Sequence, residues 1–119
     1  MRRSPESLLP LKDLELQVLL ALESEPLHGY ALLTEVAERS PGVMKPGPAS
    51  LYRTLAKLSE DGLLEDAPKH ARTDSKDPRR RYFRPTALGR AVLHAELRRL
   101  SALLAEAKAA GIRYGRGAS

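Results

Sequence analysis

The chain has 119 residues, a formal net charge of +5 and no cysteine. This length is enough for one compact domain with one hydrophobic core. The lack of cysteine excludes disulfides, thiol catalysis and cysteine-based zinc sites. No apolar run approaches the ~18 residues of a membrane span, and the N-terminus lacks the apolar core of a secretory signal. We therefore expect a cytoplasmic protein without a membrane partner.

The charge is unevenly distributed along the chain. Residues 1–66 carry a net charge of −4, residues 67–84 carry +5, and residues 85–119 carry +4. A concentrated cationic segment indicates a polyanionic partner, with nucleic acid favoured over an acidic membrane. A solvated basic loop is the alternative that charge alone leaves open.

Apolar spacing predicts helices over residues 11–25 and 30–39. The first helix is apolar on nearly every side in its second half, so it requires burial on two faces. Pro26 ends this helix. The segment "SPGVMKPGP" (residues 40–48), with its three prolines and two glycines, ends the second.

A third helix begins near Pro48, a residue suited to the first helical turn. Its apolar stripe consists of Leu51, Leu55 and Leu58. Gly62 stands where the helix would need a left-handed C-terminal cap.

Two short strands are predicted next, at residues 63–67 and 80–85, with an exposed polar loop between them. Phe83, the only phenylalanine of the chain, is expected in the core. Thr86 is a good N-cap for a long last helix over residues 87–110.

This order of elements predicts a mainly α fold with a small β-hairpin, namely a winged helix-turn-helix with a long C-terminal dimerisation helix. We divide the chain into an N-terminal arm (1–10), a winged helix-turn-helix DNA-binding domain (11–86), the C-terminal helix (87–110) and a flexible tail (111–119).

In a helix-turn-helix protein the second helix of the unit lies in the major groove and reads base edges. The candidate DNA-binding residues on the third helix are Ser50, Tyr52, Arg53 and Lys57. Arg53 can donate two hydrogen bonds to guanine, whereas Lys57 lies a turn further along and suits the DNA backbone. Tyr52 either contacts a phosphate or holds the helix against the wing.

Basic residues of the hairpin are candidates for phosphate contacts, which add affinity without sequence information. They are Lys69, Arg72, Lys76, Arg79, Arg80 and Arg81. For each of them a solvated side chain is the alternative.

The last helix carries an apolar seam with alternating spacings of four and three residues, the pattern of a contact between two helices. A winged helix already has a core without this seam. We therefore predict a homodimer formed through Leu93, Leu97, Leu100 and Leu104. A helix packed on its own domain is the alternative. Val92 and Leu103 lie off the seam and would cover the first helix or the wing.

The chain offers little for catalysis or metal binding. Its histidines, His28, His70 and His94, lack metal-ligand spacing such as a pair one helical turn apart. His28 is expected to cap or pack the second helix, and His94 is expected at the surface. No enzymatic activity, metal or cofactor is expected.

Three segments resemble PadR-family transcriptional regulators and occur in the family's order. They are "LELQVLLALESEPLHGYALLTEV" (14–36), "SLYRTLAKLSEDGLLE" (50–65) and "RRRYFRPTALG" (79–89). They resemble the family's His-Gly-Tyr start of the second helix, its recognition helix with a Leu-Tyr pair, and its wing return. Arg53 stands where the family commonly has proline, which makes it a candidate specificity determinant. The single helix after the wing resembles the family's short branch.

The resemblance implies a dimeric and usually repressing regulator, and many relatives respond to small aromatic or drug-like molecules bound near the dimer interface. We expect a sequence-specific DNA-binding transcriptional regulator that binds an inverted-repeat operator in double-stranded DNA as a homodimer and is released by a small effector. Two alternatives remain. One is a non-specific architectural DNA-binding protein, and the other is a winged-helix module for protein assembly.

Overall fold

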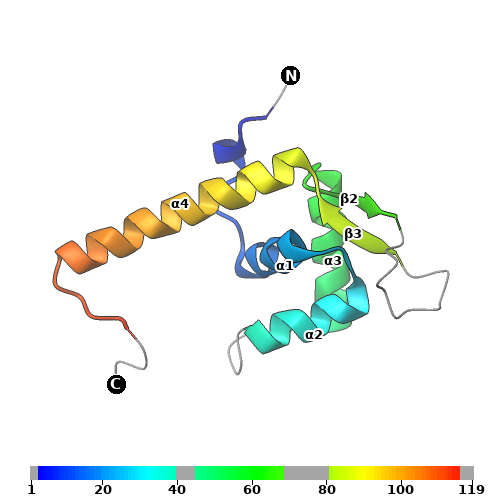
Figure 1. Cartoon of the computed structure of the whole chain (residues 1–119), viewed down its shortest axis with the longest axis horizontal. Coiled ribbons are helices and arrows are strands. Elements are labelled where there is room, and N and C mark those ends of the chain that lie inside the picture. The colour runs from blue at the N-terminus through cyan, green and yellow to red at the C-terminus, as the bar shows by residue number, and fades with distance from the viewer. Residues whose placement is uncertain (1–2, 40–44, 69–80, 116–119) are drawn as a thin grey trace.

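The computed structural model describes residues 3–39, 45–68 and 81–115. These ranges contain four α-helices, a short 3₁₀ helix and a three-stranded antiparallel sheet (Figure 1). The predicted mainly α fold with a small sheet is confirmed, and the predicted helix limits agree closely with the observed ones.

The central element is α1 (Asp13–Ser24), which packs against the other three α-helices and against the sheet (Figure 1). Val18, Leu19, Ala21 and Leu22 are all buried. Successive residues of a helix point about 100° apart, so these four cover more than one face of α1. The predicted burial on two faces is confirmed.

Helix α2 (Gly29–Arg39) is the first helix of the helix-turn-helix. Its Leu32 and Val36 are fully buried. At its start, Nδ1 of His28 accepts a hydrogen bond from the backbone N–H of Ala31 at 3.2 Å. His28 therefore caps this helix, as predicted.

Helix α3 (Pro48–Glu60) is the second helix of the unit and begins with proline in its first turn, as predicted. Gly62 has φ +80°, the left-handed conformation that glycine adopts most easily beyond a helix end. The residues that anchor α3 in the core are Leu51, Leu55 and Leu58.

The sheet has the strand order β1–β3–β2, with β1 at Leu27–His28, β2 at Leu64–Ala67 and β3 at Tyr82–Pro85. Tyr82 and Phe83 are both buried, although neighbours along a strand point to opposite faces. Phe83 lies in the core, as predicted. The Tyr82 ring meets the His28 ring edge-on, with centroids 5.2 Å apart.

The sequence did not predict β1 or the 3₁₀ helix η1 (Pro5–Leu8). Strand β1 has two residues, and its partner β3 is remote in the sequence. No local pattern marks such a strand, because its hydrogen bonds exist only once β3 is in place. The predicted two-stranded hairpin is therefore two strands of a three-stranded sheet.

The start of α4 (Ala87–Ala109) is locked onto the turn that follows α3. The Thr86 hydroxyl accepts from the N–H of Gly89 at 3.0 Å, which confirms the predicted N-cap, and donates to the carbonyl of Gly62 at 2.6 Å. The N–H of Thr86 donates to the carbonyl of Leu63 at 3.0 Å. A side chain at Gly89 would collide with that same carbonyl. Glycine is thus required for this close approach.

A buried carboxylate holds the segment before α1 on α4. Glu96 is 1% exposed, and its Oε2 accepts from the N–H of Leu11 at 2.8 Å. Arg99 donates to both carboxylate oxygens, at 2.6 and 3.1 Å. The hydrogen bonds from Arg99 and then from Leu11 lower the pKa of Glu96, although burial acts in the opposite direction.

Gly89→Ala is expected to lower the free energy of unfolding by about 1–3 kcal/mol, because the backbone of Leu63 cannot move aside as a flexible side chain would. Urea unfolding followed by circular dichroism measures the change. Gly115→Ala is the control, since its added Cβ meets nothing within 4 Å. Equal stability of the two variants would contradict the close packing described above.

Glu96→Gln is expected to lower the free energy of unfolding by roughly 1–3 kcal/mol at neutral pH, since it removes charge-assisted hydrogen bonds. The pKa of Glu96 is lower in the folded chain than in the unfolded chain. Its stabilisation is therefore present above the unfolded pKa and is lost as the pH falls through the folded pKa. Urea unfolding should show that the gap between wild type and variant narrows at acidic pH.

The control for this substitution is Glu106→Gln, on an exposed position of the same helix. It should change the free energy of unfolding by less than about 0.5 kcal/mol. The loss of unfolding free energy in Glu96→Gln should depend on pH and exceed the loss in Glu106→Gln. If either expectation fails, the Glu96 carboxylate does not hold the segment before α1 on α4.

Candidate nucleic-acid interface

Helix α3 presents a polar face opposite its three buried leucines. Arg53 and Lys57 are exposed on this face and Ser50 is half-buried at its edge. The apolar spacing of α3 therefore predicted correctly which of its side chains reach solvent.

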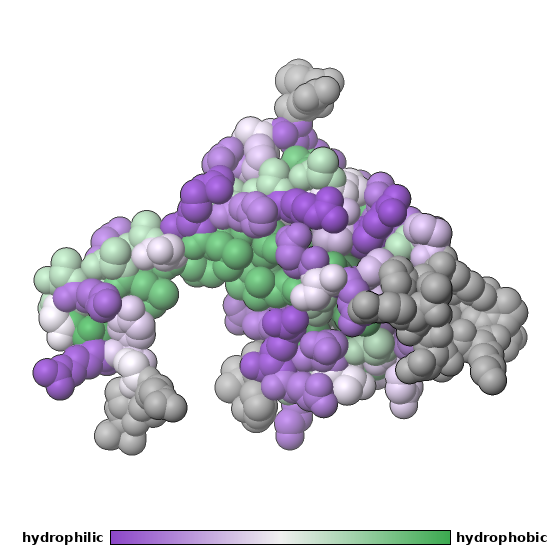
Figure 2. All heavy atoms as spheres, viewed as in Figure 1, coloured by the Kyte–Doolittle hydropathy of each residue, from purple (hydrophilic) through white to green (hydrophobic). Residues whose placement is uncertain are grey.

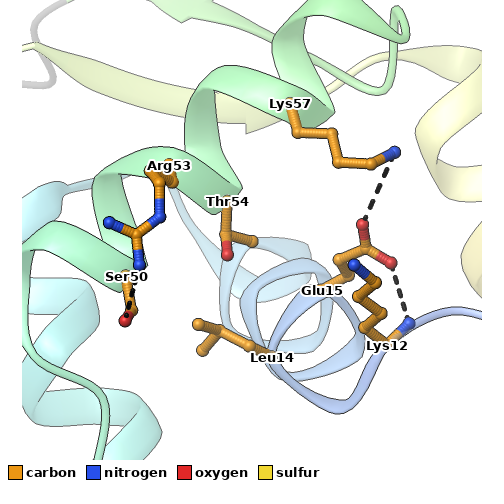
Figure 3. Close-up of a pocket in the computed structure, with 7 residues that line it drawn as sticks. All are labelled: Lys12, Leu14, Glu15, Ser50, Arg53, Thr54 and Lys57. Carbon is orange, nitrogen blue, oxygen red and sulfur yellow. Dashed lines mark hydrogen bonds and ion pairs between the residues drawn. The ribbon is translucent and has the colours of Figure 1, made fainter.

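Arg53 is oriented by a neighbour one helical turn before it. Its Nη2 donates to the Ser50 hydroxyl at 3.3 Å (Figure 3). Among the described residues the guanidinium has no other hydrogen bond. It therefore keeps N–H donors for a planar bidentate partner such as a guanine edge or a phosphate.

Lys57 is exposed but already paired with acidic side chains. Its Nζ lies 2.9 Å from Asp61 and 3.9 Å from Glu15 of α1. The hydrogen bond from Lys57 to Asp61, together with the charge of that carboxylate, raises the pKa of the lysine. Lys57 therefore stays cationic, and an incoming anion would have to compete with Asp61 and Glu15.

Tyr52 is 52% exposed and packs against the start of α2. A Cβ added to Gly29 would lie 2.6 Å from the tyrosine hydroxyl oxygen. Glycine at this position thus makes room for the ring beside α2. The contact holds α3 against α2, whereas sequence analysis considered a contact with the wing.

Only one of the six predicted hairpin cations lies within the described residues. Arg81 donates to Asp66 at 2.7 Å and lies over the Phe83 ring, 5.1 Å from its centroid. Its side chain is 65% exposed. The other candidates, which lie outside the described residues, are Lys69, Arg72, Lys76, Arg79 and Arg80.

The sequence did not indicate three residues that border the same face of α3, namely Lys12, Glu15 and Thr54. The start of α1 lies beside α3 only in the folded chain, because these elements are far apart in the sequence. The one local signal is Glu15, whose Oε1 accepts from the N–H of Lys12 at 2.8 Å, as the glutamate of a capping box does.

A comparison with known protein families identifies the family of this chain. The model of the transcriptional regulator PadR-like family matches residues 18–95, more than half of the chain. The chain belongs to the PadR-like family. The family resemblance of its three segments is thereby confirmed. No curated protein is similar enough in sequence to count as a relative.

Several solved structures share the fold of this PadR-like chain. A PadR family transcription regulator from Clostridium difficile is 18% identical with a TM-score of 0.68, over 82% of this chain and 96% of that one. A PadR family transcriptional regulator from Eggerthella lenta is 28% identical with a TM-score of 0.62, over 80% and 78%. Bacillus subtilis PadR in complex with operator DNA is 20% identical with a TM-score of 0.61, over 74% and 48%.

The last helix of this PadR-like regulator places the predicted dimerisation residues in different environments. Leu93 is 1% exposed and belongs to the core of its own domain, so its assignment to an intermolecular seam is wrong. Leu97 and Leu104 are 38% and 48% exposed, and Leu100 is half-buried. Leu103 is 47% exposed, so it does not cover α1 or the wing as expected.

These exposed leucines lie where α4 extends away from the other helices (Figure 1). Figure 2 shows apolar surface along the inner side of α4, continuing toward its C-terminal half. Val92, by contrast, is fully buried, as predicted. Two further apolar side chains are exposed beyond the helix, Ile112 and Tyr114, and the sequence did not indicate them.

Within the part of the chain that the structure describes, no helix is long and apolar enough to cross a membrane. The same residues contain no cluster of three histidine, aspartate or glutamate side chains that could hold a metal ion. His94 is exposed, as predicted, with its Nε2 3.8 Å from a carboxylate oxygen of Glu23.

Proposed function

We propose that this PadR-like regulator binds a specific operator in double-stranded DNA, with α3 in the major groove. The observation that carries the proposal is the Ser50–Arg53 pair near the N-terminal end of α3. In helix-turn-helix proteins this end of the second helix contacts base edges. The solved complex of Bacillus subtilis PadR with operator DNA supports the same use of the fold.

Each residue of the face has a different part in this proposal. Arg53 reads a guanine with two hydrogen bonds, and Ser50 orients it. Lys57 and Tyr52 contact the sugar-phosphate backbone on either side of α3. Arg81 and the basic residues between β2 and β3 add phosphate contacts, since residues 67–84 carry a net charge of +5.

We further propose that two copies pair through α4. Leu97 and Leu104 are exposed and lie seven residues apart, on one face of the helix, with half-buried Leu100 between them. An apolar patch of this kind in a soluble protein marks an interaction site. Two paired α4 helices would present two copies of α3 to an inverted repeat, with half-sites about 34 Å apart. Binding of this kind at a promoter would repress transcription.

Release by a small aromatic or drug-like effector is the last part of the proposal. The family resemblance favours an effector near the dimer interface, where the exposed leucines of α4 supply apolar surface.

Two other functions are weaker. An architectural protein would bind every duplex equally through phosphates, and it would not need a guanidinium oriented on the base-reading face. A protein-assembly module would not need cations on both α3 and the wing.

Arg53→Ala is expected to cost about 1–3 kcal/mol of binding free energy on the operator and to relax the preference at one base pair. Fluorescence anisotropy with DNA from upstream of the protein's own gene, against a scrambled duplex, measures both effects. Arg53→Lys is the matched variant, because it keeps the charge and loses the bidentate geometry. It should retain binding to scrambled DNA while losing preference for the operator.

If Arg53→Ala loses the same binding free energy on operator and on scrambled DNA, Arg53 does not read a base. Equal binding of the wild type to both duplexes would favour the architectural alternative. Absence of binding at low salt would favour the protein-assembly module.

Leu97→Glu combined with Leu104→Glu is expected to give a folded monomer with much weaker operator binding, because two buried carboxylates would oppose pairing of α4. Light scattering reports the mass and circular dichroism reports folding. The control, Ala102→Glu with Ala109→Glu, adds the same charges elsewhere on the exposed part of α4. A double leucine variant that remains dimeric would rule out this interface.

A further inference from the structure

A cleft of about 230 Å³ lies between the start of α1 and the side of α3. It is lined by Lys12, Leu14, Glu15, Ser50, Arg53, Thr54 and Lys57 (Figure 3). The cleft thus adjoins the base-reading face of α3 but includes residues of α1 that the proposed function has not used.

The charges around this cleft are unbalanced. Lys12, Arg53 and Lys57 line it together with one carboxylate, that of Glu15, which leaves two positive charges in excess. In Figure 3, Lys57 extends from α3 toward Glu15, whereas Lys12 lies beside Glu15 at the start of α1 and is joined to it through its backbone N–H. The lysines are exposed, whereas Glu15 is only 7% exposed. An anion entering the cleft would therefore meet the cations before it met the carboxylate.

The Glu15 carboxylate is the negatively charged group that the cleft itself contains. One of its oxygens accepts from the N–H of Lys12 at 2.8 Å, and the other lies 3.9 Å from Nζ of Lys57. The distance to Lys57 exceeds that of a good charge-assisted hydrogen bond.

Lys57 also donates to Asp61 at 2.9 Å, but both side chains of this pair are solvent-accessible, and such a pair contributes only about 0–1 kcal/mol. The lysine can consequently turn from both carboxylates toward a phosphate at small cost. The hydroxyls of Ser50 and Thr54 offer further hydrogen-bond donors beside it.

The position of the cleft indicates which anion it would bind. With α3 in the major groove, a site on the flank of α3 faces the sugar-phosphate strand that borders the groove. A phosphodiester carries one negative charge and accepts hydrogen bonds from ammonium and hydroxyl groups, which are the groups present here.

We propose that this cleft binds a backbone phosphate of the operator, with Lys12 as a DNA contact outside the helix-turn-helix. Lys57 exchanges Asp61 and Glu15 for the phosphate on binding, and Ser50 and Thr54 donate from α3. This inference rests on the proposed DNA-binding function. It adds α1 to the elements that contact DNA and determines the depth at which α3 sits in the groove.

Lys12→Ala is the test, measured by fluorescence anisotropy on operator and scrambled duplexes over a range of salt concentrations. A lost phosphate contact should weaken binding to both duplexes on the order of tenfold per subunit at about 0.1 M salt, and lower the slope of log K against log salt by about one per subunit. The preference for operator over scrambled DNA should stay constant. Lys108→Ala, which removes the same charge from the last turn of α4, is the control and should change neither quantity.

Glu15→Gln provides a second readout with the opposite sign. Glutamine keeps an oxygen that accepts from the N–H of Lys12, so the helix cap survives while one of the two carboxylates that compete for Lys57 is removed. This variant should bind both duplexes several-fold more tightly. Circular dichroism checks that α1 is intact.

The outcomes distinguish a failure of the phosphate-site proposal from a failure of the proposed DNA-binding function. If the wild type binds the operator but Lys12→Ala behaves as Lys108→Ala does, the cleft is not a phosphate site and the proposed function stands. If Lys12→Ala loses affinity for the operator but not for scrambled DNA, Lys12 reads a base, and the proposed contact with a backbone phosphate is wrong. If the wild type binds no duplex, both proposals fail together.

Discussion

The attachment of α4 to the turn after α3 is the constraint on which the arrangement of the molecule depends. Thr86 hydrogen-bonds to the carbonyls of both Gly62 and Leu63, and the bare backbone of Gly89 lies against Leu63. The end of the proposed DNA-reading helix and the start of the proposed pairing helix are thus a few atoms apart. Packed backbone deforms little, so a change in how two α4 helices pair would be transmitted directly to the orientation of α3.

Several cations on the described surface are paired with carboxylates. Arg81 pairs with Asp66, Arg84 with Glu65, and Lys57 with Asp61. Exposed pairs of this kind contribute only about 0–1 kcal/mol, so a polyanion can replace the acidic partner at little cost. Arg53 differs because its partner is a hydroxyl. The same surface therefore combines cations that are paired with carboxylates and one guanidinium that keeps N–H donors for a partner.

The sequence predicted some residues of the candidate site and missed others, for reasons that differ from residue to residue. Ser50, Arg53 and Lys57 follow from the leucine spacing of one helix, so a local pattern was enough to place them outward. Leu93 continues the seam of Leu97 and Leu104, yet it lies inside the domain because the first turns of α4 cover α1 and the sheet. Lys12 was not foreseen, because its position beside α3 depends on the packing of α1.

The sequence by itself determined the four helices, their caps at Thr86 and Gly62, two of the three strands and the polar face of α3. These features depend on side-chain periodicity and backbone preference, which act over a few neighbouring residues. Only the tertiary structure decided where the seam of α4 becomes exposed, which strand completes the sheet, and that Lys12, Glu15 and Lys57 share one cleft. Such features join residues distant in the chain, so they arise from packing and from no local pattern.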